Sequence, residues 1–211
     1  YARRNLWTGI LNVGDDYVYS DTDSLKCLNM NDHIEYIKAY NEMVSKKLEL
    51  MVKHYDINPA LLAPKTIENV VKPIGVWDSE GTYNRFKTLG AKRYMTEVNG
   101  KLSLTVAGLS KANGLATMIT NAGGDNNKVF EMFNDELYIP ASGTGKMTHT
   151  YIDQVHEFNC VDFQGHETHV KTLSGVHLEP CDFTLSLARE FTDFIEHLKR
   201  GEIFKGVSKI L

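Results

Sequence analysis

The sequence predicts an α+β fold, and three features support this prediction. Two short β-type runs, Tyr17–Ser20 and Leu25–Leu28, flank a polar turn and are expected to form an antiparallel β-hairpin. A long amphipathic helix is expected over 31–55, where apolar residues recur at steps of three and four. Short β-type runs broken by glycine fill 130–180, and a final helix is expected over 185–200.

The helix expected over 31–55 has recognisable boundaries. Asn31 or Asp32 can serve as its N-cap, and Pro59 lies just beyond its end. Its apolar stripe consists of Ile34, Ile37, Val44, Leu48, Met51 and Tyr55. Another helix is expected over 1–11, which has no initiator Met and no capping residue before it. We therefore expect the chain to be a fragment of a longer protein.

A second hairpin is expected around Asn99-Gly100. Asn-Gly is one of the strongest signals for a two-residue hairpin turn, because both residues tolerate positive φ. The alternating residues that would face one another across this turn are Tyr94, Thr96 and Val98 on one side and Leu102, Leu104 and Val106 on the other.

A domain boundary is predicted near 121–127, the stretch NAGGDNN. This stretch has a Gly pair, four Asn or Asp residues and no apolar periodicity. It divides the chain into 1–120 and 121–211. The helix expected over 185–200 closes the second part, with basic residues in its last turn and Gly201 just after it.

Composition limits the classes of function. The 23 Lys and Arg and 27 Asp and Glu give a formal charge of -4, so contacts with nucleic acid would need local basic patches. The three cysteines, Cys27, Cys160 and Cys181, are odd in number and far apart, which favours neither a disulfide framework nor a metal knuckle. No run approaches the ~18 apolar residues of a membrane-spanning helix. We therefore expect a soluble, cytoplasmic protein without a membrane partner.

The strongest local signal is Asp21-Thr22-Asp23 at the tip of the first hairpin. Residues two apart on a strand share one face, so both carboxylates are expected to point at one cation site. Carboxylates are the ligands that Mg²⁺ prefers, and two-metal phosphoryl transfer needs Mg²⁺ ions roughly 3.5–4 Å apart. An isolated Asp-x-Asp is more often a simple turn, so this prediction depends on its context.

That context resembles a known family. The run YSDTDS between two apolar strands resembles motif C of the family B DNA polymerases. Downstream, GVWDSE over 75–80 and RFKTLGAKRY over 85–94 resemble the segment of that family that ends in Lys-x-Tyr. The spacing from the Trp to the Lys-x-Tyr is most similar to that of the protein-primed, phi29-like branch found in phages and organellar elements.

The resemblance implies a role for each matching residue. Asp23 would be the principal metal ligand, and Asp21 would support it or bind metal secondarily. Lys92 and Tyr94 would grip the primer strand, with Arg93 on the opposite face of the same strand. The implied cofactor is Mg²⁺, and the implied partners are a DNA primer–template, a deoxynucleoside triphosphate and a terminal priming protein.

The resemblance also gives the predicted parts a meaning. Residues 1–120 would be the C-terminal part of a polymerase palm, with its antiparallel hairpin and long amphipathic helix. Residues 121–211 would be a β-rich thumb that ends in a helix. Lys146 and His149 would contact the DNA backbone from that thumb. A phage-encoded enzyme would act in the cytoplasm of its bacterial host.

Two motifs of the family do not occur in this sequence. Motif A supplies the other essential metal ligand, and motif B holds the incoming nucleotide. We therefore expect the chain alone to be inactive in nucleotide incorporation. Two alternatives stay open: a non-catalytic DNA-binding module, and another two-metal enzyme such as a nuclease. A nuclease would need a further cluster of acidic residues, and a pure binding module would have little use for Asp21-Thr22-Asp23.

Overall fold

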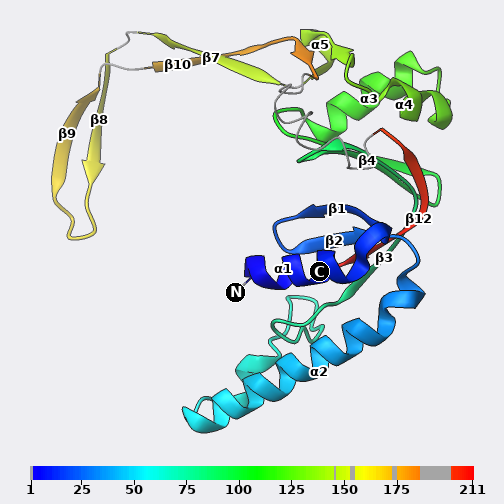
Figure 1. Cartoon of the computed structure of the whole chain (residues 1–211). Helices are drawn as coiled ribbons and strands as arrows, with labels where there is room; N and C mark the ends of the chain where they lie inside the picture. The colour runs from blue at the N-terminus through cyan, green and yellow to red at the C-terminus, as the bar shows by residue number, and fades with distance from the viewer. Residues whose placement is uncertain (1, 145, 153–154, 173–174, 186–200) are drawn as a thin grey trace. The chain divides into compact units, whose positions relative to one another are not determined.

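The computed structural model describes the chain except for residues 1, 145, 153–154, 173–174 and 186–200 (Figure 1). The chain forms two compact units. The first unit comprises Tyr1–Ser103 and Thr192–Leu211, and the second unit comprises Leu104–Phe191. The predicted boundary at 120/121 therefore lies within the second unit, and the first unit includes C-terminal residues that the sequence did not associate with it.

An antiparallel half-barrel sheet of six strands forms the framework of the first unit, in the order β1-β2-β12-β3-β4-β5. The strands are β1 (Tyr17–Asp21), β2 (Ser24–Cys27), β3 (Ser79–Gly90), β4 (Arg93–Val98), β5 (Lys101–Val106) and β12 (Ile203–Ile210). Both predicted hairpins, β1–β2 and β4–β5, are confirmed. Asn99 and Gly100 have φ values of 50° and 78°, as the expected two-residue turn requires.

The central position of β12 is the main feature that the sequence did not predict. β12 lies between β2 and β3, with Ile210 opposite Leu25 on one side and Val207 opposite Tyr83 on the other. Val207 and Ile210 are almost fully buried. Residues at the C-terminal end of the chain therefore join the first hairpin to the rest of the sheet.

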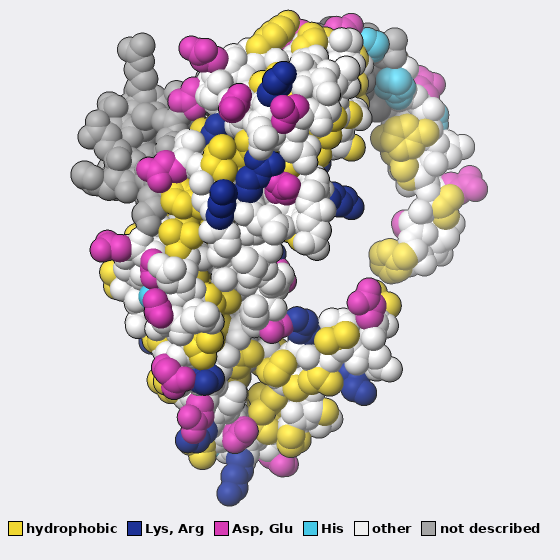
Figure 2. All heavy atoms as spheres, turned by 90° about the vertical axis from the view of Figure 1, so that its right-hand side faces the viewer, with side chains coloured by type: hydrophobic (Ala, Val, Ile, Leu, Met, Phe, Trp, Pro, Cys, Tyr) yellow, Lys and Arg dark blue, Asp and Glu magenta, His cyan; other side chains and the backbone are white. Residues whose placement is uncertain are grey.

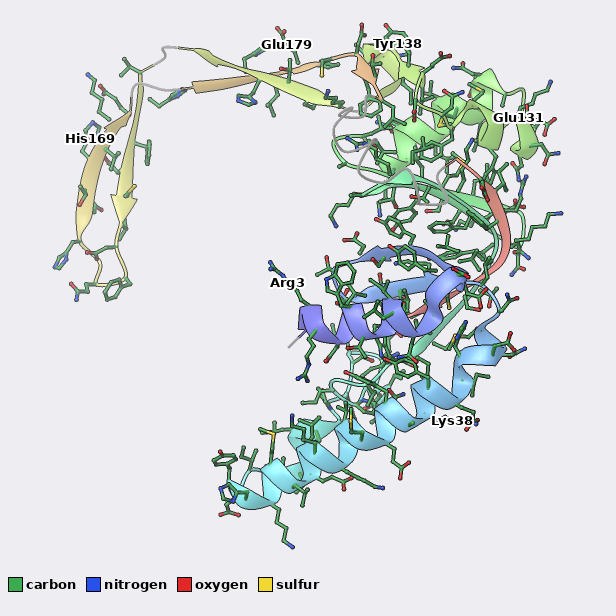
Figure 3. The ribbon with its side chains drawn as sticks, viewed as in Figure 1. Arg3, Lys38, Glu131, Tyr138, His169 and Glu179 are labelled. Atoms are coloured by element: carbon green, nitrogen blue, oxygen red, sulfur yellow. The ribbon has the colours of Figure 1, made fainter. Side chains whose placement is uncertain are left out.

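Helices α1 (Ala2–Val13) and α2 (Met30–His54) pack against one face of this sheet. Their shared core contains Val13, Leu25, Cys27, Tyr40, Trp77 and Ile210. The predicted helix over 31–55 is confirmed with a shift of one residue. Its N-cap is Asn29, in the left-handed region with φ 45°, rather than Asn31 or Asp32. Lys38 on α2 projects away from the sheet (Figure 3).

The opposite face of the sheet has its own smaller core. Val18, Tyr19, Phe86 and Val207 are buried together there, and Tyr83, Tyr94 and Phe204 pack around them. Register shifts leave an extra residue in β1 opposite β2 and in β3 opposite both β12 and β4, and such bulges bend strands and increase their twist. This second core lines the concave side of the half-barrel.

The second unit begins with three short helices that the sequence analysis missed. They are α3 (Lys111–Asn121), α4 (Asn126–Met132) and α5 (Ala141–Thr144), with β6 (Tyr138–Ile139) paired to β11 (Phe183–Thr184). The predicted loop over 121–127 shrinks to four residues between α3 and α4. Ser110 and Asp125 cap these two helices through their side chains, and Met118, Phe130 and Phe133 are fully buried.

The predicted β character of 130–180 is present mainly in two hairpins. β7 (Met147–Ile152) pairs with β10 (Gly175–Pro180), and β8 (His156–Val161) pairs with β9 (Glu167–Thr172). Every residue of β8 is exposed. His169 projects from the second hairpin (Figure 3) and contacts Asn159 and Glu157 across it.

The α+β class is confirmed, whereas palm and thumb stay predictions. The helix expected over 185–200 lies outside the described residues, apart from its first residue. Within the described part of the chain, no helix is long and apolar enough to cross a membrane.

Burial of β12 gives a first testable prediction. Ile210→Ala should lower the free energy of unfolding of the first unit by about 2–5 kcal/mol, because Ile210 is 1% exposed in its core. Ile203→Ala, on the same strand but 42% exposed, is the matched control and should cost far less. Urea titration followed by the fluorescence of Trp7 and Trp77, which both belong to the first unit, would measure both losses. Equal losses would contradict the central placement of β12.

Candidate functional site

The first hairpin ends in a two-residue turn that holds the Asp21-Thr22-Asp23 motif. Thr22 has φ 51°, and the backbone N–H of Asp23 donates to the carbonyl oxygen of Asp21 at 2.6 Å. The hydroxyl of Ser24 donates to the same carbonyl at 3.1 Å. Asp21 is the last residue of β1, whereas Asp23 lies in the turn and is exposed. The strand pleat therefore does not by itself align the two carboxylates.

Asp21 forms an ion pair with Lys92, a residue 71 positions away. The ammonium group of Lys92 donates to Oδ1 and Oδ2 of Asp21 at 2.9 and 2.8 Å. The hydroxyl of Thr22 also donates to Oδ1, at 3.0 Å. The Lys92 hydrogen bond lowers the pKa of Asp21, and the same bond raises the pKa of Lys92. The segments singled out in the sequence as motif C and Lys-x-Tyr thus meet in the structure.

Tyr19 fixes the backbone at Lys92. The N–H of Lys92 donates to the Tyr19 hydroxyl at 3.0 Å. Lys92 lies in the turn before β4 with φ 53°, not on the strand as the sequence suggested. The ring of Tyr94 lies 5.1 Å from that of Tyr19 and stacks on Phe86 at 5.6 Å. Lys92 and Tyr94 therefore both contact Tyr19 on the concave side of the sheet.

Sheet curvature is what permits this contact. Tyr19 belongs to β1 and Tyr94 to β4, and three strands separate β1 from β4 in the sheet. In a flat sheet four strand spacings would separate them by roughly 19 Å. Rings 5.1 Å apart require the sheet to bend around the Tyr19–Phe86–Tyr94 cluster.

Lys26 is a site residue that the sequence analysis missed. Its side chain is 2% exposed, donates to the Ser24 hydroxyl and lies 5.3 Å from the centre of the Tyr19 ring. Burial, followed by repulsion from Lys209 on the neighbouring β12, lowers the pKa of Lys26 to about 8. The negative charges of Asp21 and Asp23 oppose this shift, because they raise the pKa of Lys26. The only signal in the sequence was a lysine at an alternating position of a short strand.

The Tyr19 hydroxyl remains protonated throughout the neutral range. Burial raises its pKa to about 12, although the bond from the Lys92 N–H opposes this shift. Tyr19 is therefore a neutral anchor between the two lysines.

Asp23 lines a cavity of about 260 Å³ on the α1 and α2 side. Asn5, Tyr40 and Trp77 also line it. Asn41 on α2 fixes the Trp77 backbone, accepting from its N–H at 2.7 Å and donating to its carbonyl at 2.8 Å. Among the described residues, the Asp23 carboxylate makes no side-chain hydrogen bond or ion pair, so it is the more available of the two carboxylates.

The metal-binding capacity of the hairpin tip is incomplete. Asp21 and Asp23 are the hard oxygen donors that Mg²⁺ prefers. However, the described part of the chain contains no group of three or more His, Cys, Asp or Glu side chains that could hold a metal ion. Asp21 and Asp23 could supply at most two ligands to a Mg²⁺ ion, and water, phosphate or another carboxylate would have to supply the rest.

The other predicted DNA-binding residues lie in different surroundings. Arg93 begins β4 and is partly buried. Lys146 belongs to the second unit, where its ammonium group lies 5.5 Å from the centre of the Phe183 ring. His149, on β7, is exposed.

No protein-family model, curated protein or solved structure matches this chain. The candidate site therefore depends on its own residues and geometry.

The buried Lys26 gives a prediction about pH. In the folded protein the Lys26 ammonium group loses its proton near pH 8, whereas in the unfolded chain it keeps the proton up to about pH 10.5. Between these values the unfolded state binds more protons, so the contribution of Lys26 to stability rises with pH. Below pH 8 the buried charge costs up to about 3 kcal/mol. The free energy of unfolding of Lys26→Met should therefore exceed that of the wild type by the largest margin at pH 7.

Urea titrations at pH 7, 8.5 and 10 would test this prediction. The stability difference between Lys26→Met and the wild type should shift against the variant as the pH rises. Lys101→Met, at an exposed position of β5, should show a constant difference. A constant difference for Lys26→Met as well would show that Lys26 keeps an ordinary pKa.

Proposed function

We propose that the chain is the palm and thumb portion of a family B DNA polymerase, which catalyses template-directed nucleotidyl transfer with two Mg²⁺ ions. One observation supports this most strongly. Two segments that resemble separate polymerase motifs meet through the Asp21–Lys92 ion pair and the Tyr19–Tyr94 ring contact.

Asp23 and Asp21 are the residues that would hold Mg²⁺. The ions would activate the primer hydroxyl and stabilise charge on the leaving phosphate. The exposure of Asp23 and the engagement of Asp21 by Lys92 favour Asp23 as the principal ligand. This assignment agrees with the order of the two carboxylates in the resembling motif.

Lys92 and Tyr94 would position the primer strand. An ammonium group beside a phenol can contact phosphate and sugar together, and such contacts set the register without reading sequence. Lys92 is well suited because its backbone is anchored by Tyr19 while its side chain is 59% exposed. Lys146 would add a backbone contact from the thumb.

The surface charge agrees with modest rather than tight DNA binding. The formal net charge is -4, and acidic and basic side chains are intermixed on the face drawn in Figure 2. A primer–template would therefore be held by a few local contacts, and its affinity would fall as salt rises. The incoming deoxynucleoside triphosphate and a terminal priming protein are further partners of the proposed enzyme.

Catalysis gives a direct test of Asp23. In a polypeptide that joins this chain to motifs A and B, Asp23→Asn should reduce nucleotide incorporation about a thousandfold, because losing a metal ligand removes several kcal/mol of transition-state stabilisation. Primer extension assays would measure this. Asp56→Asn is the control, since Asp56 is exposed and Asn tolerates its φ of 51°. Near-normal incorporation by Asp23→Asn would exclude it from the metal site.

DNA binding tests the primer contact in the 211-residue chain itself. With Mg²⁺ present, Lys92→Ala should weaken binding to labelled primer–template and reduce the slope of log K against log salt by about 0.9. Tyr94→Phe should weaken binding more mildly, because it keeps the ring and removes only the hydroxyl. Fluorescence anisotropy over a salt series would measure both.

Lys101→Ala serves as the charge-matched control, because Lys101 is exposed at the start of β5. If Lys92→Ala and Lys101→Ala lost affinity equally, the primer contact would have to be abandoned. A strong preference for one DNA sequence would instead favour a sequence-specific binding module.

A further inference from the structure

The ammonium group of Lys92 forms hydrogen bonds with both carboxylate oxygens of Asp21. Its ammonium group lies 2.9 and 2.8 Å from Oδ1 and Oδ2 of Asp21. The proposed function gives each partner another task, since Asp21 would bind Mg²⁺ and Lys92 would bind phosphate. Neither task is compatible with the pair as it stands, because Mg²⁺ binds oxygen at about 2.0–2.1 Å and repels a neighbouring ammonium group.

We infer that Lys92 is an exchangeable counter-cation for Asp21, which Mg²⁺ displaces and which then binds a phosphate of the DNA. This inference rests on the proposed function. It makes Mg²⁺ and DNA binding mutually dependent through one side chain. Each ligand must then raise the affinity of the chain for the other by the same factor.

The surroundings of Lys92 allow its side chain to move while its backbone stays fixed. The Lys92 N–H donates to the Tyr19 hydroxyl at 3.0 Å, and this bond fixes the main chain at Lys92. The Tyr19 ring is in turn held in place by its contact with the Tyr94 ring. The side chain itself is more than half exposed, so its ammonium group can leave Asp21 without uncovering a core. A displaced ammonium group therefore stays within one side-chain length of the hairpin tip.

Lys26, the other lysine near Asp21, cannot exchange in the same way. Its ammonium group is buried against Tyr19 and bonded to the Ser24 hydroxyl. It affects Asp21 only through long-range electrostatics, and it lowers the pKa of Asp21 less than Lys92 does. Removing Lys92 should therefore change the metal affinity of the tip while the buried charge beneath it stays in place.

Mg²⁺ binding by the 211-residue chain tests the first half of the exchange. Isothermal titration calorimetry without DNA should show that Lys92→Ala binds Mg²⁺ about fivefold or more tightly than the wild type, as a coupling of ordinary size would give. Lys101→Ala removes the same charge from the start of β5, at the opposite edge of the sheet order from β1, and should bind like the wild type. Equal Mg²⁺ affinities for these two variants would overturn the exchange.

DNA binding without Mg²⁺ tests the second half. Asp21→Asn should release Lys92 and raise the affinity for labelled primer–template, and added Mg²⁺ should then have little further effect. Asp23→Asn removes the same charge two residues away but leaves the Asp21–Lys92 pair intact, so its gain in DNA affinity should be smaller. Equal gains for the two variants would show that only net charge matters and would overturn the release of Lys92.

The two proposals can fail separately. If the wild-type chain bound no primer–template at low salt in Mg²⁺, the polymerase assignment would fail, and the phosphate half of the exchange with it. The Mg²⁺ affinities would still decide whether Lys92 competes with metal for Asp21. Near-ultraviolet circular dichroism and Trp77 fluorescence would confirm that each variant keeps the fold of the first unit.

Discussion

Curvature of the six-stranded sheet is the constraint on which the candidate site depends. β12 joins the β1–β2 hairpin to β3 and β4, and bulges in β1 and β3 let the sheet bend. The rings of Tyr19, Phe86 and Tyr94 pack together on the concave side of the bend. Without it, the hairpin tip and the turn at Lys92 would be separated by the width of three intervening strands.

The same curvature explains the electrostatics of the tip. Its concave side is lined by aromatic and aliphatic groups, so charges at its rim are only partly solvated. Burial lowers the pKa of Lys26, whereas the hydrogen bonds from Lys92 lower the pKa of Asp21 and keep its carboxylate ionised. Burying the Lys26 ammonium group costs stability, and its hydrogen bond to Ser24 and the field of the nearby carboxylates offset only part of that cost. Lys26 places a buried positive charge beneath the turn that is proposed to bind Mg²⁺.

Local patterns in the sequence predicted the local elements of the first unit well. The hairpin turns and the helix over 31–55 depend on residues close together in the chain, so periodicity and turn chemistry were sufficient. β12 was missed because its burial arises from pairing with strands more than 100 residues away. Lys26 was missed for the same reason, since Lys209 becomes its neighbour only through β12. The Asp21–Lys92 ion pair was not predicted, because the family resemblance singled out both residues but gave them separate roles in metal binding and primer binding.

The balance of charge at the tip links structure to the proposed chemistry. Asp21 and Asp23 contribute two negative charges, and Lys92 and Lys26 contribute two positive charges at neutral pH. The tip is therefore close to neutral by itself, and in that state it offers phosphate little attraction. A bound Mg²⁺ would make the tip positive and free an ammonium group in the same step. Such a site would bind a DNA backbone firmly only when it also held the metal that catalysis requires, which suits an enzyme that must release and rebind its template.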